Sequence, residues 1–506
     1  MIRSFARARY LLLTVYRRSR ERMLPLLLLL VGTAIIGSSM VLSNGNIAVA
    51  IALTGVLISL AITMYRLDWG FYLFLGAVLL FDQYGIPGFQ PVTLSVYYFS
   101  NLNLFYLPGA SAAVLTPMEL HFLLLLLVWL VVLAMRKGNV LVSVPVPYAM
   151  TLFFLWFLFS MVYGRAKGGD TVIAFWETRG ILYLGIMYLF VPQVIRSVDQ
   201  VQNLLWVVMI TLCVKSWQGV FRFAGNGFVF AGIDTFTNHE DPVFLVTLFL
   251  LQFGLILFGG KGGQRRALAW MAFPNLVGFF VANRRAAIAS FGAAGIGFLF
   301  LLQPDVRRRL LRPLAVIGLV FAVYLAVFWN DEGVVGTLAQ QVKSTVIDDP
   351  KAISYRNYLS NYARKIQDYN LAMTYRRAFV MGVGFGMPYD VHIIMWDPLR
   401  HGLTLYIPHN QVVWLAVKMG AFGYFTFWFF LDCFIFYGAV QFARLKSPYL
   451  QAVLAICILA IINQIVVSYV DMQLTYYRNM VYLGTLMGLV PAIAEANRRI
   501  NGATEG

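Results

Sequence analysis

Long apolar runs separated by short polar segments recur along the whole chain. Most are close to twenty residues long, which is the length an α-helix needs to cross the hydrocarbon core of a bilayer. The chain is therefore predicted to be an all-α, polytopic integral membrane protein. We predict fourteen spans, at about residues 24–42, 47–65, 69–81, 117–135, 147–163, 172–192, 201–222, 243–259, 267–282, 285–302, 313–329, 410–442, 449–469 and 478–494.

Two of these runs have unusual lengths, so the predicted number of membrane spans is twelve to fourteen. The run 69–81 is short for a membrane span, and the run 410–442 is long enough to include a re-entrant or interfacial lead. Composition agrees with the class, since 60% of the residues are hydrophobic and only 12% are charged. The mean hydropathy is +0.74. These values exclude a soluble domain.

The net charge of +17 would suit a nucleic-acid partner, but the distribution of the charge argues against one. Basic residues cluster in short segments between alternate apolar runs, which is the signature of membrane topology. The N-terminal segment, 1–23, contains seven arginines and is predicted to be cytoplasmic and able to lie on anionic lipid. Alternation from there places both termini in the cytoplasm.

This topology divides the chain into regions. Residues 24–170 form N-terminal spans, residues 171–329 and 409–496 form a core, and residues 497–506 form a cytoplasmic tail. The longest external segment, 330–408, is predicted to be an ordered loop with a helix at about 354–379.

Arginines near the outer face are candidates for an anion site. Arg179 lies within a span, and Arg284 and Arg285 lie where one span ends and the next begins. A charge in hydrocarbon costs several kcal/mol, so such residues face a cavity or a partner. Guanidinium groups match phosphate oxygens. The alternatives are that Arg179 pairs with Glu177 and that the two adjacent arginines mark a helix end.

Histidines and glycines near the outer face add to the pattern. His239 follows a span and His409 precedes one, but the histidines are not spaced as metal ligands, so no metal or other cofactor is predicted. Glycines at 382, 384 and 386 would form a plain turn or direct N–H groups at an anion. Asn410 would orient His409 or cap the following helix. Lys418, further into that span, is predicted to face water or lipid headgroups.

The residues from His409 onward carry a resemblance to a known family. The pattern is His-Asn, nine residues, Gly420, two residues and Gly423. It resembles a signature of the O-antigen ligase and Wzy-type polymerase superfamily. The glycines 382–386 resemble the family's glycine segment before that histidine, and "NRRAAIAS", which contains Arg284, resembles its arginine motif. The resemblance covers about residues 170–490.

The resemblance implies a metal-independent, GT-C-like glycosyltransferase in the bacterial inner membrane, acting on the periplasmic face. Its donor would be a glycan on undecaprenyl pyrophosphate, and its acceptor another glycan or lipid A core. His409 and Asn410 would be catalytic, with His409 acting as a general base or as a cation that orients the pyrophosphate. Donor binding would fall to Arg179, Arg284 and Arg285 and to a loop arginine, with Arg356 preferred over Arg377. Supporting positions would be His239, Gly382, Gly384, Gly386, Gly420 and Gly423.

Three functions remain open at this point. A polymerase would use a second lipid-linked glycan as acceptor, whereas a ligase would join the chain to a terminal acceptor. Membrane lipids and chain-length regulators or other polysaccharide-assembly proteins are the expected partners. A lipid-linked oligosaccharide flippase is the alternative from another class. It would show repeat symmetry and charges near the bilayer midplane.

Overall fold

The computed structural model describes residues 47–86, 88–89, 91–101, 115–135, 141–230, 233–258, 262–394 and 403–504, with seven further residues between 30 and 41. The predicted N-terminal segment 1–23 lies outside these residues, and the predicted first span, 24–42, lies largely outside them. So do residues 395–402 of the long external loop.

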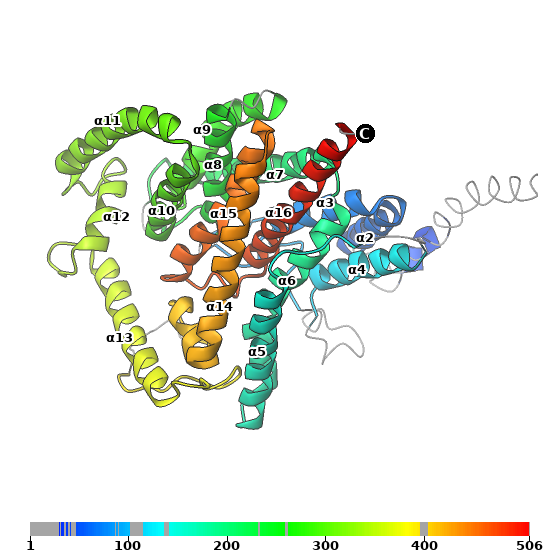
Figure 1. Cartoon of the computed structure of the whole chain (residues 1–506). Coiled ribbons are helices and arrows are strands. Elements are labelled where there is room, and N and C mark those ends of the chain that lie inside the picture. Colours follow the sequence, from blue (N-terminus) through cyan, green and yellow to red (C-terminus); the bar gives the residue numbers. More distant parts are fainter. Residues whose placement is uncertain are drawn as a thin grey trace, which may run out of the picture. The chain divides into compact units, whose positions relative to one another are not determined.

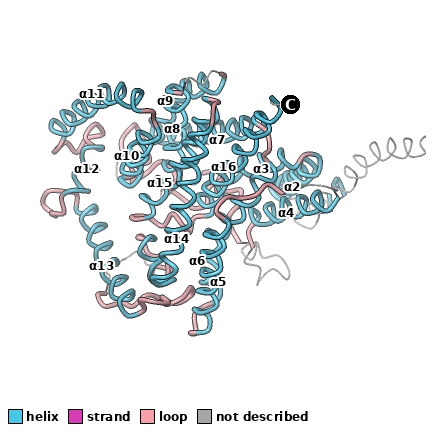
Figure 2. Tube along the Cα trace, viewed as in Figure 1, coloured by secondary structure: helices cyan, strands magenta, loops and turns pink. Residues whose placement is uncertain are grey.

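The described chain is helical and contains no β-strand (Figure 2). Its helices, labelled in Figure 1, are α2 (Ile47–Tyr65), α3 (Leu67–Leu80), α4 (Pro117–Met135), α5 (Pro147–Ala166), α6 (Thr171–Val194), α7 (Val198–Gly225), α8 (Asp241–Leu257), α9 (Gly263–Val281), α10 (Arg285–Leu301), α11 (Pro304–Phe328), α12 (Thr337–Val346), α13 (Tyr355–Arg377), α14 (Gln411–Arg444), α15 (Pro448–Ser468) and α16 (Tyr477–Thr504).

The predicted spans and the observed helices agree closely. Every predicted span after the first coincides with one helix, to within a few residues except at the start of α11 and the end of α16. In the described part of the chain, eight helices are long and apolar enough to cross a membrane, and four shorter helices are apolar. The protein is therefore a helical, membrane-embedded protein. The two helices α12 and α13 confirm that the described part of the segment 330–408 is partly helical.

Backbone contacts divide the chain into two units. One contains α2, the first half of α3 and the part of α4 from His121 to Met135. Within it, α2 and α4 are joined by a 2.8 Å hydrogen bond between Ser59 Oγ and His121 Nε2. The other unit contains Phe74–Leu120 and all residues from Arg136 onward. It holds every candidate site residue.

Two helices form the centre of this larger unit. In the most apolar stretch of α16, 94% of the residues are buried, and in that of α15, 78% are buried. The reason is that α16 packs along α6 and α15 packs against α8 and α10 (Figure 1). In the most apolar stretch of α11, by contrast, no residue is buried. A helix that is apolar and yet unburied by protein has surface suited to lipid.

Local sequence explains where several of these helices begin. Proline occupies the first turn of α5, α8, α11 and α15, where its missing N–H costs nothing. The Asp170 carboxylate accepts hydrogen bonds from two N–H groups at the start of α6, and Ser197 forms a capping box with Gln200 at the start of α7. Asn410 caps α14 by accepting from Val413 N at 3.1 Å. The capping role considered for Asn410 is therefore confirmed.

Candidate functional site

The helix that follows His409 is broken within the apolar region. At Gly420, α14 has φ 70° and ψ −176°, so the chain forms a short helix up to Met419 and a longer one after the break. A side chain at Gly420 would meet the Val380 carbonyl oxygen at 2.1 Å, so only glycine fits here. The run that looked too long for one span thus contains two helical pieces.

The glycine segment closes this break. Val383 N donates to Val417 O at 2.8 Å, and Gly384 N donates to Lys418 O at 3.0 Å. These bonds satisfy carbonyl groups that the broken helix leaves without partners. The glycines at 382, 384 and 386 all have positive φ, and a Cβ at any of them would collide with backbone.

The N–H groups of the three glycines are used within the protein. Gly382 N donates to Ala378 O at 2.8 Å, and Gly386 N donates to Glu177 Oε2 at 2.5 Å. With Gly384 bound to Lys418, none of the three N–H groups is directed at a ligand. The segment 382–386 is therefore a tight structural turn, as in the first of the two alternatives considered from the sequence. We call this segment the glycine strap. Gly423 allows α14 to pack closely against α5, since a Cβ there would meet the Trp156 ring at 2.5 Å.

Lys418 is fully buried and paired. Its Nζ lies 2.6 Å from Glu177 Oε1, both side chains are 0% exposed, and Nζ also donates to Met387 O. The prediction that Lys418 faces water or lipid headgroups is wrong, because Glu177 on α6 neutralises the charge inside the protein. The pair ties α6, the glycine strap and the break in α14 together.

His409 is held by α13, the longer helix of the segment 330–408. Gln367 Oε1, on α13, accepts from the His409 backbone N–H at 2.9 Å and lies 3.1 Å from the ring Nδ1. Asp368, the next residue of α13, interacts with the Asn410 side chain. Burial raises the pKa of Asp368, and the hydrogen bond from Asn410 opposes this effect. His409 and Asn410 are therefore fixed from the same helix.

Arg284 and His239 are in direct contact. An Arg284 N–H group donates to His239 Nε2, so that nitrogen has no hydrogen and the proton lies on Nδ1. Nδ1 lies 3.8 Å from Asp471 Oδ2, in the loop between α15 and α16. Burial and the charge of Arg284 lower the pKa of His239, so its neutral form is favoured.

Three arginines come together here with no ion-pair partner among the described residues. Arg285 NH1 donates to Ser344 O at 2.9 Å and to Asn361 Oδ1 at 3.0 Å, which are neutral acceptors. Arg284 and Arg364 both lie close enough to Arg285 to repel its charge. The Arg364 Nε atom is buried and makes no hydrogen bond to the described residues. Two carboxylates, Asp471 and Asp368, act on this group from further away. The cluster Arg284–Arg285–Arg364 is nevertheless a concentration of positive charge, with three cations and two anions.

The other predicted arginines form ion pairs elsewhere. Arg179 is 1% exposed, and its NH1 lies 3.2 Å from Glu119 Oε1, so its partner is not the Glu177 considered from sequence. Arg356 pairs with Asp234, and Arg377 Nε lies 2.8 Å from Asp390 Oδ2. The structure therefore does not bring Arg179, Arg356 and Arg377 into the arginine cluster.

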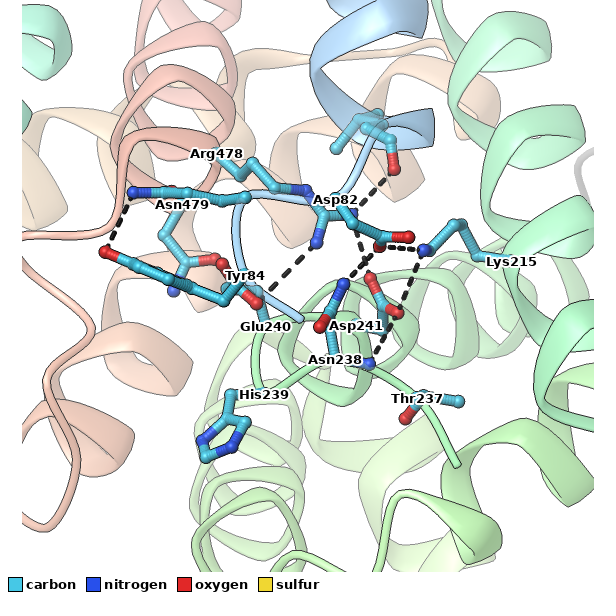
Figure 3. A network of polar contacts seen from close by, with 12 residues as sticks. Asp82, Tyr84, Lys215, Thr237, Asn238, His239, Glu240, Asp241, Arg478 and Asn479 are labelled. Carbon is cyan, nitrogen blue, oxygen red and sulfur yellow. Dashed lines mark hydrogen bonds and ion pairs between the residues drawn. The ribbon is translucent and has the colours of Figure 1, made fainter. Parts of the chain in front are cut away.

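A second group of charged side chains, which includes the two residues after His239, is drawn in Figure 3. Lys215 pairs with Asp82 and lies 3.6 Å from Asp241, and Arg478 NH2 donates to Asp241 Oδ1 at 2.8 Å. Arg478 also donates to two carbonyl groups at the end of α3. In Figure 3 the His239 ring points away from this network. Its bonds join α3, α7, α8 and α16, so we interpret it as structural.

Glu240 gives this network a testable pH dependence. The network has three acids, Asp82, Glu240 and Asp241, but only two bases. Glu240 Oε2 lies 3.6 Å from Arg478 NH1, and neither Glu240 carboxylate oxygen makes a hydrogen bond to the described residues. Burial raises the pKa of Glu240 from 4.5 to about 7. A carboxyl whose pKa is higher in the folded state binds more protons there, so stability falls as pH rises through this window.

We expect the Glu240→Gln variant to lack this decrease in folding stability at higher pH. Between pH 5 and pH 8 the wild-type protein should lose up to about 3 kcal/mol of stability relative to this variant. Thermal unfolding of the detergent-solubilised protein at a series of pH values measures the difference. Glu332→Gln changes an exposed glutamate and serves as the control. Parallel pH curves for wild type and Glu240→Gln would contradict the expectation.

Comparison with known proteins adds no assignment. No family model matches this chain. No curated protein sequence matches it either. Within the described residues, no three His, Cys, Asp or Glu side chains are grouped as metal ligands. The functional argument therefore depends on the geometry of the site.

Sequence reasoning preferred Arg356 as the loop arginine, whereas Arg364 is the one that lies in the arginine cluster, and it did not consider Gln367 or Asp471. A helical period places positions 356, 364 and 367 on one side of the helix predicted at 354–379. The period therefore could have favoured Arg364 as well as Arg356. Which turn of that helix faces His409 is a tertiary contact, and the sequence has no local signal for it.

Proposed function

We propose that this protein is a membrane glycosyltransferase of the O-antigen ligase and Wzy-type polymerase superfamily, with fourteen spans and a GT-C-like core. It transfers a glycan from undecaprenyl pyrophosphate to a hydroxyl of an acceptor glycan on the periplasmic face of the bacterial inner membrane. The observation that supports this best is the group of three arginines that form no ion pair among the described residues, one of which, Arg364, lies on the same helix as the residue that contacts His409.

The arginines suit the leaving group of such a reaction. As the bond between the sugar anomeric carbon and the phosphate oxygen breaks, negative charge grows on the lipid pyrophosphate. Fixed cations in a site with little water stabilise that charge more in the transition state than in the ground state. The cluster Arg284–Arg285–Arg364 provides three such cations without rearrangement of any ion pair.

His409 suits the acceptor side. The acceptor hydroxyl oxygen forms the new bond to the anomeric carbon, and its proton passes to His409 Nε2. The lipid pyrophosphate leaves with the electrons of the broken bond. No oxidant or second co-reactant is needed, so the step balances with donor, acceptor and histidine alone.

The arginine cluster makes a direct prediction. Arg284→Gln, Arg285→Gln and Arg364→Gln should each lower kcat/KM about 10²-fold or more, because each removes a cation aimed at the developing charge. Initial rates with a lipid-linked saccharide donor measure the effect. Arg376→Gln, an exposed arginine on the same α13, is the matched control and should stay within about threefold of wild type. Equal losses in all four variants would remove the cluster from the mechanism.

One assay separates the two forms of the proposal. Purified protein is given a lipid-linked repeat unit as its only substrate, and the products are separated by size. The external positive charge of the long segment favours a polymerase, for which a ladder of products is expected. A reaction that starts only when a second acceptor is added would indicate the ligase. No transfer with any acceptor, together with movement of the lipid-linked saccharide across a vesicle membrane, would overturn the proposal in favour of a flippase.

A further inference from the structure

One side-chain oxygen contacts two nitrogens of His409. Gln367 Oε1 lies 2.9 Å from the His409 backbone N and 3.1 Å from the ring Nδ1. A backbone N–H can only donate, so the Gln367 atom that faces it must be the amide oxygen and not the amide nitrogen. This settles the orientation of the amide.

The same oxygen then determines where the imidazole carries its proton. An amide oxygen only accepts, so a 3.1 Å contact with Nδ1 is a hydrogen bond only when Nδ1 holds the hydrogen. In the neutral ring, Nε2 then carries the lone pair. Nε2 is the nitrogen on the opposite side of the ring from Gln367, and it is the atom that could accept a proton from a substrate.

Gln367 is itself well held. It is 1% exposed on α13, and its Nε2 donates to the Tyr389 hydroxyl at 3.4 Å. The neighbouring Asp368 interacts with the Asn410 side chain, so two adjacent residues of α13 contact His409 and Asn410. Arg364 lies one turn earlier on the same helix. One helix of the polar segment therefore carries both an arginine of the anion site and the residue that orients the histidine.

We propose that Gln367 is a positioning residue that holds His409 with its proton on Nδ1 and so makes Nε2 the proton-accepting atom. The inference rests on the proposed function, in which His409 is the general base. Loss of this contact removes the acceptor that favours a hydrogen on Nδ1, and every departure from this tautomer reduces the fraction of enzyme ready to react.

Two variants test the role. Gln367→Leu removes both hydrogen bonds and should lower kcat about tenfold or more, with a smaller effect on KM. Gln367→Glu keeps an acceptor and adds a negative charge against Nδ1. An opposite charge at this distance raises the pKa of the imidazole, so the acidic limb of the pH–rate profile should move up by about one unit or more. The ionisable groups next to Gln367 on α13, Arg364 and Asp368, and the groups that act on Arg364, namely Arg284 and Asp471, are unchanged in both variants.

The chain offers a matched control on the same helix. Asn370 is 2% exposed, and its Oδ1 also accepts from two backbone N–H groups, those of His392 and Ile393. Asn370→Asp makes the same chemical change, one turn away, without touching His409. It should leave the acidic limb in place even if it lowers the yield of folded protein.

The outcomes distinguish this inference from the proposed function. His409→Ala is measured beside the Gln367 variants. If His409→Ala keeps its activity, the proposed role of the histidine fails. If His409→Ala is inactive while both Gln367 variants keep the wild-type rate and pH profile, the positioning role is wrong and the proposed function stands. A limb that moves equally in Gln367→Glu and Asn370→Asp would also overturn the positioning role.

Discussion

His409→Ala should lower the rate of glycan transfer by at least about 10²-fold while the protein stays folded. General base catalysis contributes about 10² to 10⁴ in rate, and the structure holds this histidine in one orientation through Gln367. The measurement is kcat with a lipid-linked saccharide donor, beside a thermal unfolding curve of the same preparation. His392→Ala is the control, since His392 is an exposed histidine of the same polar segment.

The pH profile decides which role His409 has. A base must be neutral, so activity should rise with pH through the histidine titration and should be lost in acid. A histidine that orients the pyrophosphate as a cation must be protonated, so activity would fall over the same range. The Gln367 contact suits both forms, because the neutral tautomer and the protonated ring each carry a hydrogen on Nδ1, so the direction of the pH profile is the deciding measurement. Wild-type activity in His409→Ala would contradict both roles.

The helices after the first predicted span could be located from the sequence because the signal is local. A membrane helix must be apolar over nearly its whole length, and a cap or proline fixes many of its starts. The break at Gly420 is different. The sequence showed a run too long for one span, but a glycine is common in membrane helices and does not by itself predict φ 70°.

The candidate site could be predicted only in part. The motifs around Arg284 and His409 located two residues of the candidate site, because both lie at helix ends, which the pattern of apolar runs predicts. Pairing is decided by contacts between distant segments, so the sequence could not show that Arg179 pairs with Glu119 or that Arg356 pairs with Asp234. For the same reason the sequence left Lys418 without its partner.

Lys418→Met alone should destabilise the protein by about 3–5 kcal/mol. The variant leaves the Glu177 carboxylate at 0% exposure without the cation that neutralises it, and an unpaired buried charge costs far more than the pair contributes. The pair joins α6 to the helix break, and Glu177 also accepts from Gly386 N of the glycine strap. Unfolding in mixed micelles, followed by tryptophan fluorescence, measures the loss.

The double variant Lys418→Met with Glu177→Gln should recover most of that stability. It removes both charges together, and the glutamine oxygen still accepts from Gly386 N, so the strap keeps its hydrogen bond. The exposed pair of Lys365 and Asp348 provides the matched control, where Lys365→Met should cost less than about 1 kcal/mol. If the double variant is as unstable as Lys418→Met, charge burial is not the cause, and the lysine would instead act through its hydrogen bond to Met387 O. Recovery would show that the broken helix depends on neutralisation of this pair more than on the attraction within it.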